Sequence, residues 1–502
     1  MLATALSASI AGVDGIPVRV EVDVSFGLPG LTIVGLAGSA VLEARERVRA
    51  AIRNSEFRVP ERRITVNLSP ADLPKEGTAH DLAIAVAILV ASEQLEATAL
   101  GSTGLVGELA LDGDLRPVPG ILALVAATRD GGARSIVVPD AAVDEAASVP
   151  GIAVHGATSL RDAIAHLAGV RPIMPASRTS ALTQQAEDGG EDVPDLGAVV
   201  GQHVARRALE IAVAGRHNIA LCGPPGVGKT LLARAAAGLM PPLEADEADV
   251  VRRIHSVAGM AISSAASLRR PFRAPHHTIS TQALVGGGPR IRPGEASLAH
   301  HGLLLLDETL QFRSDALDAL RGPLDAGCVM IARVDGVRLL PARFMLVTAF
   351  NPCPCGWWAV DGRACTCEDG ARRRYQARLS GPMRDRIDLY VPLAPTIPRS
   401  TRRREPSTEV RARVAAAWAR QRARQGRANA ELDPSALDRR TGFEPRIVAT
   451  LEHRGRQLGL SLRRLHRAAR VARTIADLDG SDDVRREHLD EALLHRPAEV
   501  TA

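Results

Sequence analysis

A glycine-rich segment, placed between an apolar run and a helical pattern, constrains this chain more than any other feature. Ile219 to Cys222 has the length and composition of a short strand, and Leu231 to Leu239 repeats apolar residues at helical spacing. Between them the chain fits G-x-x-x-x-G-K-[ST], which in a strand–loop–helix context forms a phosphate-binding loop. We expect the loop to bind a nucleotide's phosphates through its whole length: Gly223, Pro224, Pro225, Gly226, Val227, Gly228, Lys229 and Thr230.

The chain's use of lysine supports this interpretation. Lys75 and Lys229 are its only two lysines, and all other cationic side chains apart from histidine are arginines. A compact ammonium fits inside a phosphate loop, where a planar guanidinium does not. Lys229 would reach the β- and γ-phosphates of ATP, and Thr230 would bind Mg²⁺.

Two later segments complete a nucleotide site. Residues 302–306 are an apolar strand followed by Asp307 and Glu308, in which Asp307 would bind Mg²⁺ and Glu308 would polarise the attacking water. Phe344 to Phe350 is another apolar strand, and it ends at Asn351. Asn351 is either a sensor of the γ-phosphate at a strand tip or an ordinary turn residue before a proline.

Bulk properties limit the class of protein. A chain of 502 residues suggests two to four domains, and a hydrophobic fraction of 46% is ample for buried cores. The net charge of +5 is compatible with a nucleic-acid partner. The longest apolar run, Leu82 to Ala91, is too short to span a bilayer, and the first residues lack a signal-peptide pattern. We therefore expect a cytoplasmic protein without a membrane partner, whose six cysteines are thiols or metal ligands.

Composition divides the chain into four parts. We expect an α/β domain at residues 1–170, a linker at 171–195, an ATPase core at 196–395 and a helical region at 396–502. In the first part, period-two alternation and turn signals predict strands at 18–24, 31–34 and 64–69, helices at 40–52 and 80–91, and a hairpin across 107–118. In the last part, helical spacing predicts helices at about 408–425, 445–458, 462–478 and 483–494.

Two groups of arginines stand where one member could act on a phosphoryl group. Residues 381–386, which include Arg386, place arginines before an apolar strand at the edge of the core, and residues 462–470, which include Arg467, place several on a helix. An arginine offered to a neighbouring subunit's nucleotide can stabilise charge on the transferring group. Spacing alone assigns neither residue, because most arginines are solvated surface charge.

Four cysteines lie within fifteen residues: Cys353, Cys355, Cys365 and Cys367. Four thiolates can close a tetrahedral Zn²⁺ site, although Cys-x-Cys is tighter than the usual Cys-x-x-Cys. Free thiols in a loop remain an equal alternative. A bound Zn²⁺ would brace the loop that holds Asn351.

The chain resembles the magnesium-chelatase-like AAA+ ATPases of the YifB/ComM type. The resemblance covers nearly the whole chain and is carried by segments that occur in the family's order: Thr32–Leu36, Arg63–Leu68, Pro70–Gly77, Gly107–Leu109, Gly201–Gln202, Ile254–Gly259, Pro275–Ser280, Pro293–His300, Asn351–Gly356, Ser380–Pro382, Asp385–Leu389 and Val471–Leu478. It implies an α/β fold with a Lon-protease-like (S5 domain 2-like) N-terminal domain, an AAA+ core and a helical C-terminal lid. It also implies that Arg386 is a trans-acting arginine finger and Arg467 the lid (sensor 2) arginine.

The sequence departs from the family pattern at three places. Residues 309–311 are Thr-Leu-Gln where Leu-Pro-Glu is usual, which leaves the start of the following helix in doubt. Trp357 and Trp358 replace a usual Tyr-Tyr, and His301 replaces an Asn.

The first domain lacks the residues of a Lon-type protease. Such a site needs a serine activated by a lysine, but the loop after Gly77 reads Thr-Ala-His and residues 120–127 contain no lysine. We interpret the domain as structural or protein-binding. Lys75 is either a contact to phosphate or nucleic acid, or a turn lysine paired with a neighbouring acid.

Two inserts bear on the choice of partner. Residues 286–294 form a glycine-rich basic loop, and residues 329–340 predict a hairpin with an Asp335-Gly336 turn. Inserts at these places line the central pore in AAA+ motors that this chain resembles. Their arginines, namely Arg290, Arg292, Arg333 and Arg338, would meet DNA phosphates or would simply be solvated.

The resemblance therefore implies a homohexameric ring that uses ATP and Mg²⁺, with branched or single-stranded DNA as its substrate, similar to branch-migration helicases that act in DNA uptake and recombination. The alternatives are a chelatase-type motor that remodels a protein for metal insertion and a chaperone-like ATPase that binds protein through its first domain.

Overall fold

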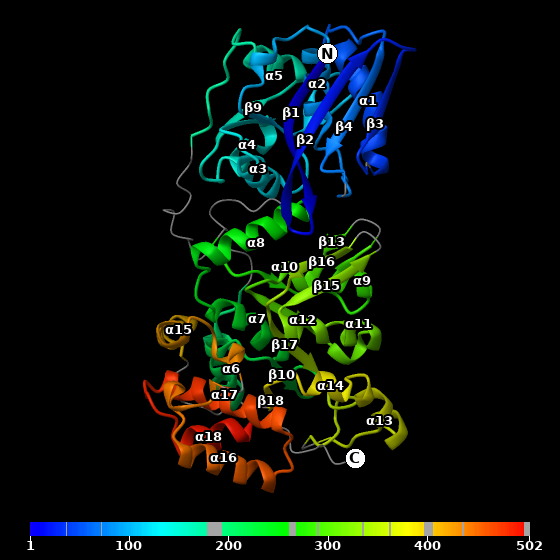
Figure 1. Ribbon diagram of the computed structural model, residues 1–502. Coiled ribbons are helices and arrows are strands. Elements are labelled where there is room, and N and C mark those ends of the chain that lie inside the picture. The colour runs from blue at the N-terminus through cyan, green and yellow to red at the C-terminus, as the bar shows by residue number, and fades with distance from the viewer. Residues whose placement is uncertain are drawn as a thin grey trace.

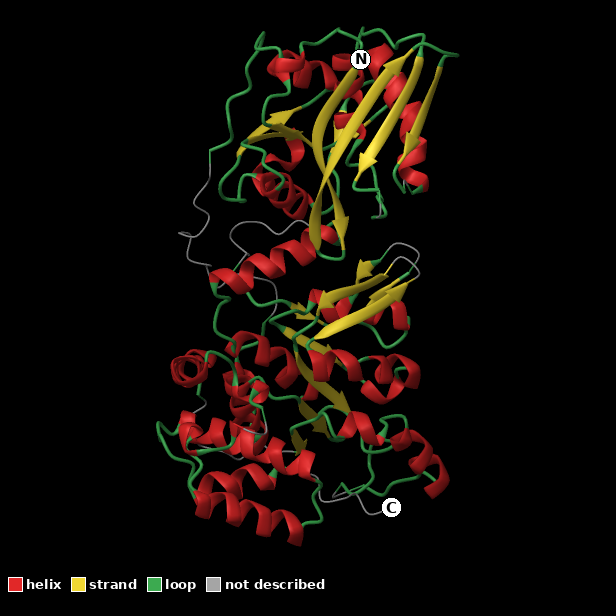
Figure 2. Ribbon diagram, in the orientation of Figure 1, coloured by secondary structure: helices red, strands yellow, loops and turns green. Residues whose placement is uncertain are grey.

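The computed structural model describes residues 1–36, 38–71, 73–177, 193–260, 268–288, 291–333, 336–360, 363–395, 405–433 and 436–495. Most of the expected linker, residues 178–192, lies outside these ranges. Along the long axis of the molecule, an N-terminal α/β unit is followed by a second α/β unit and then by a group of helices (Figures 1 and 2).

The N-terminal unit is built on a mixed seven-stranded sheet in the order β3-β4-β2-β1-β5-β8-β9. Its strands are β1 (Leu2–Ala11), β2 (Asp14–Ser25), β3 (Gly30–Val34), β4 (Arg63–Ser69), β5 (Thr103–Leu105), β8 (Ser135–Pro139) and β9 (Ala153–Ala157). Alternation along β2 buries Val18, Val20, Val22 and Val24, as the period-two pattern predicts. Strand β1 was not predicted from the sequence, because its inward residues are mostly alanine and serine and give little hydrophobic contrast.

Helices cover this sheet. They are α1 (Ser39–Asn54), α2 (Asp81–Ala91), α3 (Ile121–Asp130), α4 (Val143–Ala146) and α5 (Leu160–Leu167). Every residue of α2 is buried, which explains the apolar run that the sequence shows there. The predicted hairpin is the short ribbon β6 (Glu108–Leu109) with β7 (Leu115–Arg116).

The second unit holds a parallel five-stranded sheet in the order β11-β14-β17-β10-β18. Its strands are β10 (Ile219–Cys222), β11 (Phe272–Arg273), β14 (Leu303–Leu306), β17 (Met345–Phe350) and β18 (Leu389–Pro392). The helices around it are α6 (His203–Gly215), α7 (Lys229–Leu239), α8 (Ala245–Val257), α9 (Thr281–Val285), α10 (Glu295–Leu298), α11 (Ser314–Ala319), α12 (Arg321–Ala326), α13 (Asp369–Ala377) and α14 (Gly381–Arg384). Because β17 lies between β10 and β14, the residues that follow these three strands meet at one edge of the sheet.

Two ribbons extend from this unit next to one another (Figure 1). One pairs β12 (Gly286–Gly287) with β13 (Arg292–Pro293), and the other pairs β15 (Cys328–Arg333) with β16 (Gly336–Pro341). The predicted hairpin is thus present, but its turn residues 334 and 335 lie outside the described residues.

The C-terminal helices are α15 (Ser407–Gln425), α16 (Pro445–Gln457), α17 (Leu462–Leu478) and α18 (Arg486–Leu494). They match the four predicted helices within three residues at each end. α15 packs on α6, where Trp418 Nε1 donates to Val213 O over 3.1 Å and Gln421 Nε2 donates to Ala214 O over 2.8 Å. In the part of the chain that the structure describes, no helix is both long and apolar enough to cross a bilayer.

The tip of the β1–β2 hairpin joins the N-terminal unit to the second unit. Val13 is buried in the same apolar cluster as Ile254 of α8 and Leu340 of β16. Asp14 forms an ion pair with Arg253, and the Gly120 N–H donates to Ser256 O over 2.8 Å. In Figure 1 this hairpin reaches down to α8.

Candidate functional site

The glycine-rich segment has the geometry of a phosphate loop. It leaves the carboxyl end of β10 and leads directly into α7, which begins at Lys229. Gly226 and Gly228 have φ values of 79° and 90°, in the left-handed region that glycine adopts without strain. Their hypothetical Cβ atoms would meet nothing within 4 Å, so it is the backbone conformation that requires glycine here. The predicted strand, loop and helix are confirmed.

Lys229 lies inside this loop. Its Nζ donates to the carbonyls of Gly223 and Pro224, over 2.8 Å each, and to Oδ1 of Asn351 over 2.9 Å. Burial lowers the pKa of Lys229, while Cys222, Asp307 and Glu308 act in the opposite direction. Asn351 therefore lies beside the lysine predicted to bind the γ-phosphate, although its sensing role stays a prediction.

The Mg²⁺ ligands predicted from the sequence also meet. Thr230 Oγ1 donates to Oδ2 of Asp307 over 2.8 Å, and the Glu308 N–H donates to Oδ1 of the same carboxylate over 2.9 Å. A hydroxyl and a carboxylate are the oxygen ligands that Mg²⁺ uses beside a triphosphate. The donor set fits Mg²⁺ bound between α7 and the end of β14.

Glu308 has a histidine neighbour that the sequence analysis missed. The Glu308 side chain is 68% exposed, and its Oε2 lies 3.9 Å from Nδ1 of His277. His277 follows β11, which pairs in parallel with β14. The segments that follow these two strands therefore leave the sheet at the same edge. The available signal in the sequence was the pair of adjacent histidines, His276 and His277, but β11 is only Phe-Arg and has no apolar run that predicts a strand.

The unusual residues 309–311 form a 3₁₀ helix, and α11 follows it. The Thr309 hydroxyl is buried and donates to Leu306 O over 2.7 Å, which ties the turn back to β14. The substitution therefore leaves both carboxylates in place, as expected.

The opposite, amino-terminal edge of the sheet is organised around Asn218 and Asp388. Asn218 Nδ2 donates to Arg386 O, its Oδ1 accepts from Leu346 N–H, and its own N–H donates to Asp388. Arg467 Nη1 donates to Arg386 O over 3.0 Å and to Oδ1 of Asp388 over 2.9 Å. The lid thus contacts the sheet where its strands begin.

This placement corrects one expectation for Arg467. Asp388 precedes β18, which pairs with β10 over its four residues, and the phosphate loop follows the far end of β10. Four strand residues span about 13 Å. Arg467 therefore cannot touch the nucleotide phosphates of its own chain in this conformation.

Arg386 does not project from the core edge as the sequence suggested. It is 6% exposed. Its guanidinium donates to Arg321 O over 3.2 Å, to Pro382 O over 2.7 Å and to the Asp325 carboxylate. To act on a neighbouring subunit, Arg386 has to exchange its bond to Asp325 for one to phosphate.

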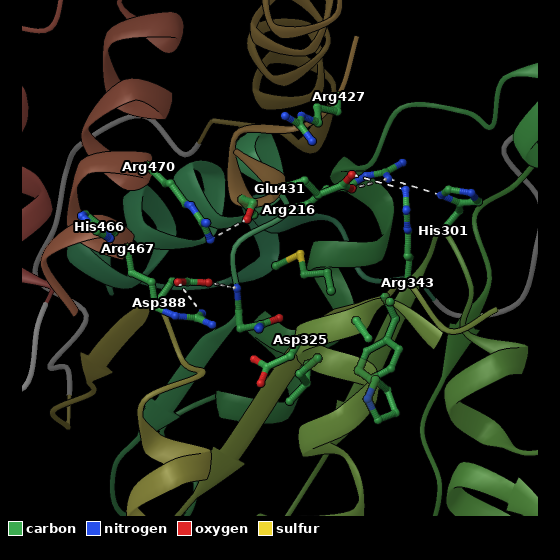
Figure 3. A pocket seen from close by; sticks show the side chains of 18 of the residues that line it. Arg216, His301, Asp325, Arg343, Asp388, Arg427, Glu431, His466, Arg467 and Arg470 are labelled. Carbon is green, nitrogen blue, oxygen red and sulfur yellow. Dashed lines mark hydrogen bonds and ion pairs between the residues drawn. The ribbon is translucent and has the colours of Figure 1, made fainter. Parts of the chain in front are cut away.

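A cavity of about 720 Å³ opens at this edge between the sheet and the lid (Figure 3). Six arginines and three carboxylates line it: Arg216, Arg343, Arg427, Arg463, Arg467 and Arg470 with Asp325, Asp388 and Glu431. Burial lowers the pKa of Arg470, whose Nε is buried and has no hydrogen-bond partner among the residues that the structure describes. The excess of positive charge favours an anionic ligand.

His301, which also lines this cavity, has a φ of 56°. Asparagine and histidine are both enriched in this left-handed region, which explains why a histidine can replace the usual asparagine. Burial, and then the nearby Arg216, lower the pKa of His301 to about 4.

The four clustered cysteines converge, although they come from two separate pieces of chain. Sγ atoms of Cys353, Cys355 and Cys365 lie 3.4, 3.6 and 3.7 Å apart, and all four Sγ atoms lie within 4.8 Å of one another. The cluster follows Asn351 and Pro352 directly.

The predicted DNA-contacting arginines have mixed positions. Arg333 donates to Gly288 O, which links the two ribbons, while Arg292 is exposed and Arg338 is half-buried. Arg290 lies outside the described residues. The exposed residues of the β15–β16 ribbon include Met330, Val337 and Leu339, which the sequence analysis did not consider.

Lys75 is 1% exposed, and its Nζ donates to Pro70 O. The hypothesis that Lys75 contacts nucleic acid is therefore wrong, because the ammonium lies inside the domain. Thr78, in the loop where a protease would carry its nucleophile, donates its hydroxyl to Glu108.

Comparison with known proteins places this geometry in a family. "Magnesium chelatase, subunit ChlI" matches residues 195–401, "Subunit ChlI of Mg-chelatase" matches 20–142, and "Magnesium chelatase, subunit ChlI C-terminal" matches 404–496. The YifB protein of Escherichia coli (strain K12) is 44% identical over 494 residues, 97% of this chain and 95% of its own. The competence protein ComM of Haemophilus influenzae is 41% identical over 499 residues, 99% of this chain and 97% of its own. The chain therefore belongs to the YifB/ComM family of magnesium-chelatase-like AAA+ ATPases.

Proposed function

We propose that this protein is a ring-forming ATPase that uses ATP hydrolysis to translocate on or remodel DNA. The observation that carries the proposal is the pair of adjacent ribbons, which bear Arg292, Arg333 and Arg338. The same chain has a phosphate loop whose Thr230 contacts Asp307, as a pair of Mg²⁺ ligands would. The near full-length similarity to a competence protein supports DNA as the substrate.

The proposal that the protein forms a ring is supported by the charge and position of the cavity at the amino-terminal edge of the sheet. Its positive charge faces away from the phosphate loop of the same chain, so the phosphates it can meet belong to another chain. Arg467 lines the cavity, and Arg386 lies behind Asp325 on its wall. In a homohexamer these two arginines would act on the nucleotide of the next subunit.

A protein substrate is the second candidate, and one observation favours it. Met330 and Leu339 are cross-strand partners, and with Val337 they are more than half exposed on the β15–β16 ribbon. Exposed aliphatic side chains suit an extended polypeptide better than a phosphate backbone. A magnesium-chelatase-like or chaperone-like motor would use the ribbon in this way.

The test that separates the two candidates is ATP turnover with and without DNA. We expect single-stranded or branched DNA to raise the turnover rate per chain, because contact with the ribbons is coupled to the ATP cycle in a DNA motor. Turnover is measured by phosphate release at fixed protein concentration, with an unfolded protein as the competing additive. Stimulation by the polypeptide and not by DNA would contradict the first proposal and support the second.

Arginines on the ribbons should determine how DNA binding depends on salt. Changing Arg292 and Arg338 to glutamine should reduce the slope of log K against log salt concentration by about 0.7 per lost contact to single-stranded DNA. Fluorescence anisotropy at several salt concentrations measures this slope. The matched control is Arg446→Gln on the exposed face of α16. If the ribbon variant and the control variant show equal salt dependence of DNA binding, the ribbons do not contact DNA.

A further inference from the structure

The cysteine cluster has the dimensions of a metal site. Zn²⁺ bound by four thiolates at about 2.3 Å requires sulfur atoms about 3.8 Å apart. The measured separations of 3.4 to 3.7 Å lie just below that value. Cys353 is fully buried and the other three are half-buried, so the site is largely shielded from solvent.

Backbone N–H groups surround the sulfurs. Trp358 N–H donates to Cys353 Sγ and Cys355 N–H donates to Cys367 Sγ, over 3.3 Å each. Amide donors aimed at sulfur stabilise thiolates and orient them around a metal. Arg363 and Arg372 stack on Trp357 and Trp358 at 4.7 and 5.3 Å, which brings positive charge towards a site with four anionic ligands. Tryptophan holds a guanidinium better than the usual tyrosine does.

We propose that Cys353, Cys355, Cys365 and Cys367 bind one Zn²⁺, and that this metal fixes the phosphate loop in the shape that receives ATP. The connection is short. Asn351, whose Oδ1 accepts from Lys229, is two residues before the first ligand. The segment between the ligands packs on the loop itself, through Gly356.

Gly356 is the point of contact. A Cβ added there would lie 2.6 Å from Cδ of Pro225 in the phosphate loop and 3.8 Å from Cγ of Asn351. Its φ is 85°, and its N–H donates to Cys353 O, which closes the turn around the first sulfur. The metal holds this turn, and the turn holds Pro225 of the phosphate loop and Asn351, whose Oδ1 accepts from Lys229. Without the metal, the two pieces of chain that carry the cysteines separate and the loop loses this support.

The first experiment removes the metal. Wild-type protein purified without chelator should contain about one Zn²⁺ per chain by elemental analysis. Cys365→Ser combined with Cys367→Ser should lose it, and the Kd for a fluorescent ATP analogue should rise by about tenfold or more, the effect of losing one hydrogen bond to a charged group. Cys328→Ser is the matched control, because this thiol lies on β15 outside the cluster.

A second variant leaves all four ligands in place. Gly356→Ala should keep the metal yet raise the Kd for the analogue, because its methyl group displaces Pro225. Gly459→Ala is its control, since Gly459 also has a positive φ, 62°, and a Cβ there meets nothing within 4 Å. This pair tests the contact even if the double serine variant does not fold.

Two results would overturn the proposal. Wild-type protein that contains no zinc would contradict the metal site. Unchanged analogue affinity in Gly356→Ala would contradict the connection between that site and the phosphate loop. The two readouts are zinc content and binding of the ATP analogue, and neither involves DNA. A protein that fails to respond to DNA but loses nucleotide affinity with its zinc would refute the proposed DNA function and leave this inference standing.

Discussion

Arg386→Ala is expected to leave ATP binding intact and to lower ATP turnover by roughly 10³-fold or more, the effect of removing an arginine finger supplied in trans. The proposed role of Arg386 on the neighbouring subunit's nucleotide also predicts that turnover per chain in the wild type rises steeply with protein concentration as rings form. Phosphate release measured across a dilution series checks this, and a six-membered ring should appear with ATP in light scattering.

Mixing variants tests whether the arginine acts between chains. Arg386→Ala retains an intact phosphate loop and Lys229→Ala retains an intact arginine, so the mixture should recover part of the lost turnover. Arg321→Ala is the matched control, since its side chain is exposed on the same edge and only its carbonyl contacts Arg386. A mixture that co-assembles but stays inactive, or full turnover in dilute monomer, would show that Arg386 is not a finger in trans.

Glu308→Gln should bind ATP normally and hydrolyse it about 10²- to 10⁴-fold more slowly, because only the activation of water is lost. The amide keeps the shape of the side chain, and Asp307 and Thr230 still hold Mg²⁺. Single-turnover hydrolysis together with analogue binding separates the two effects. Normal turnover in this variant would exclude Glu308 from the mechanism.

Lys229→Ala should instead abolish binding. Its ammonium is the cation inside the loop, and a lost hydrogen bond to a charged partner corresponds to roughly 1.5–3 kcal/mol, or about tenfold to a hundredfold in Kd for each bond. Arg234→Ala, exposed on the same helix α7, controls for a general effect of losing positive charge. Tight binding by the Lys229 variant would contradict the loop's assignment.

The nucleotide site could be predicted from the sequence because its geometry is local. The loop between β10 and α7 carries its own φ requirements at Gly226 and Gly228, and the strands before Asp307 and Asn351 are short apolar runs with polar ends. The helices of the lid were equally visible, since their buried faces follow the helical period. Parallel strand order then brings Lys229, Asp307 and Asn351 to one edge.

What the sequence could not show depends on contacts between distant segments. Arg467 follows a helical pattern that says nothing about which end of the sheet it meets, and its position is decided by Asp388, 79 residues earlier. Burial of Arg386 depends on Asp325, 61 residues earlier. Strand β1 gave no signal because alanine and serine are nearly neutral in the hydrophobic pattern. His277 was missed because its partnership with Glu308 exists only through strand pairing.

The hairpin that joins the two α/β units also has a consequence for synthesis on the ribosome. Asp14 and Arg253 are 239 positions apart, and at about 5–20 residues per second their synthesis is separated by roughly 12 to 48 s. During that interval the tip around Val13 has no α8 to cover it, although the sheet behind it can already form. The nascent N-terminal unit therefore exposes an apolar tip until the second unit emerges, and the two units complete each other's folding.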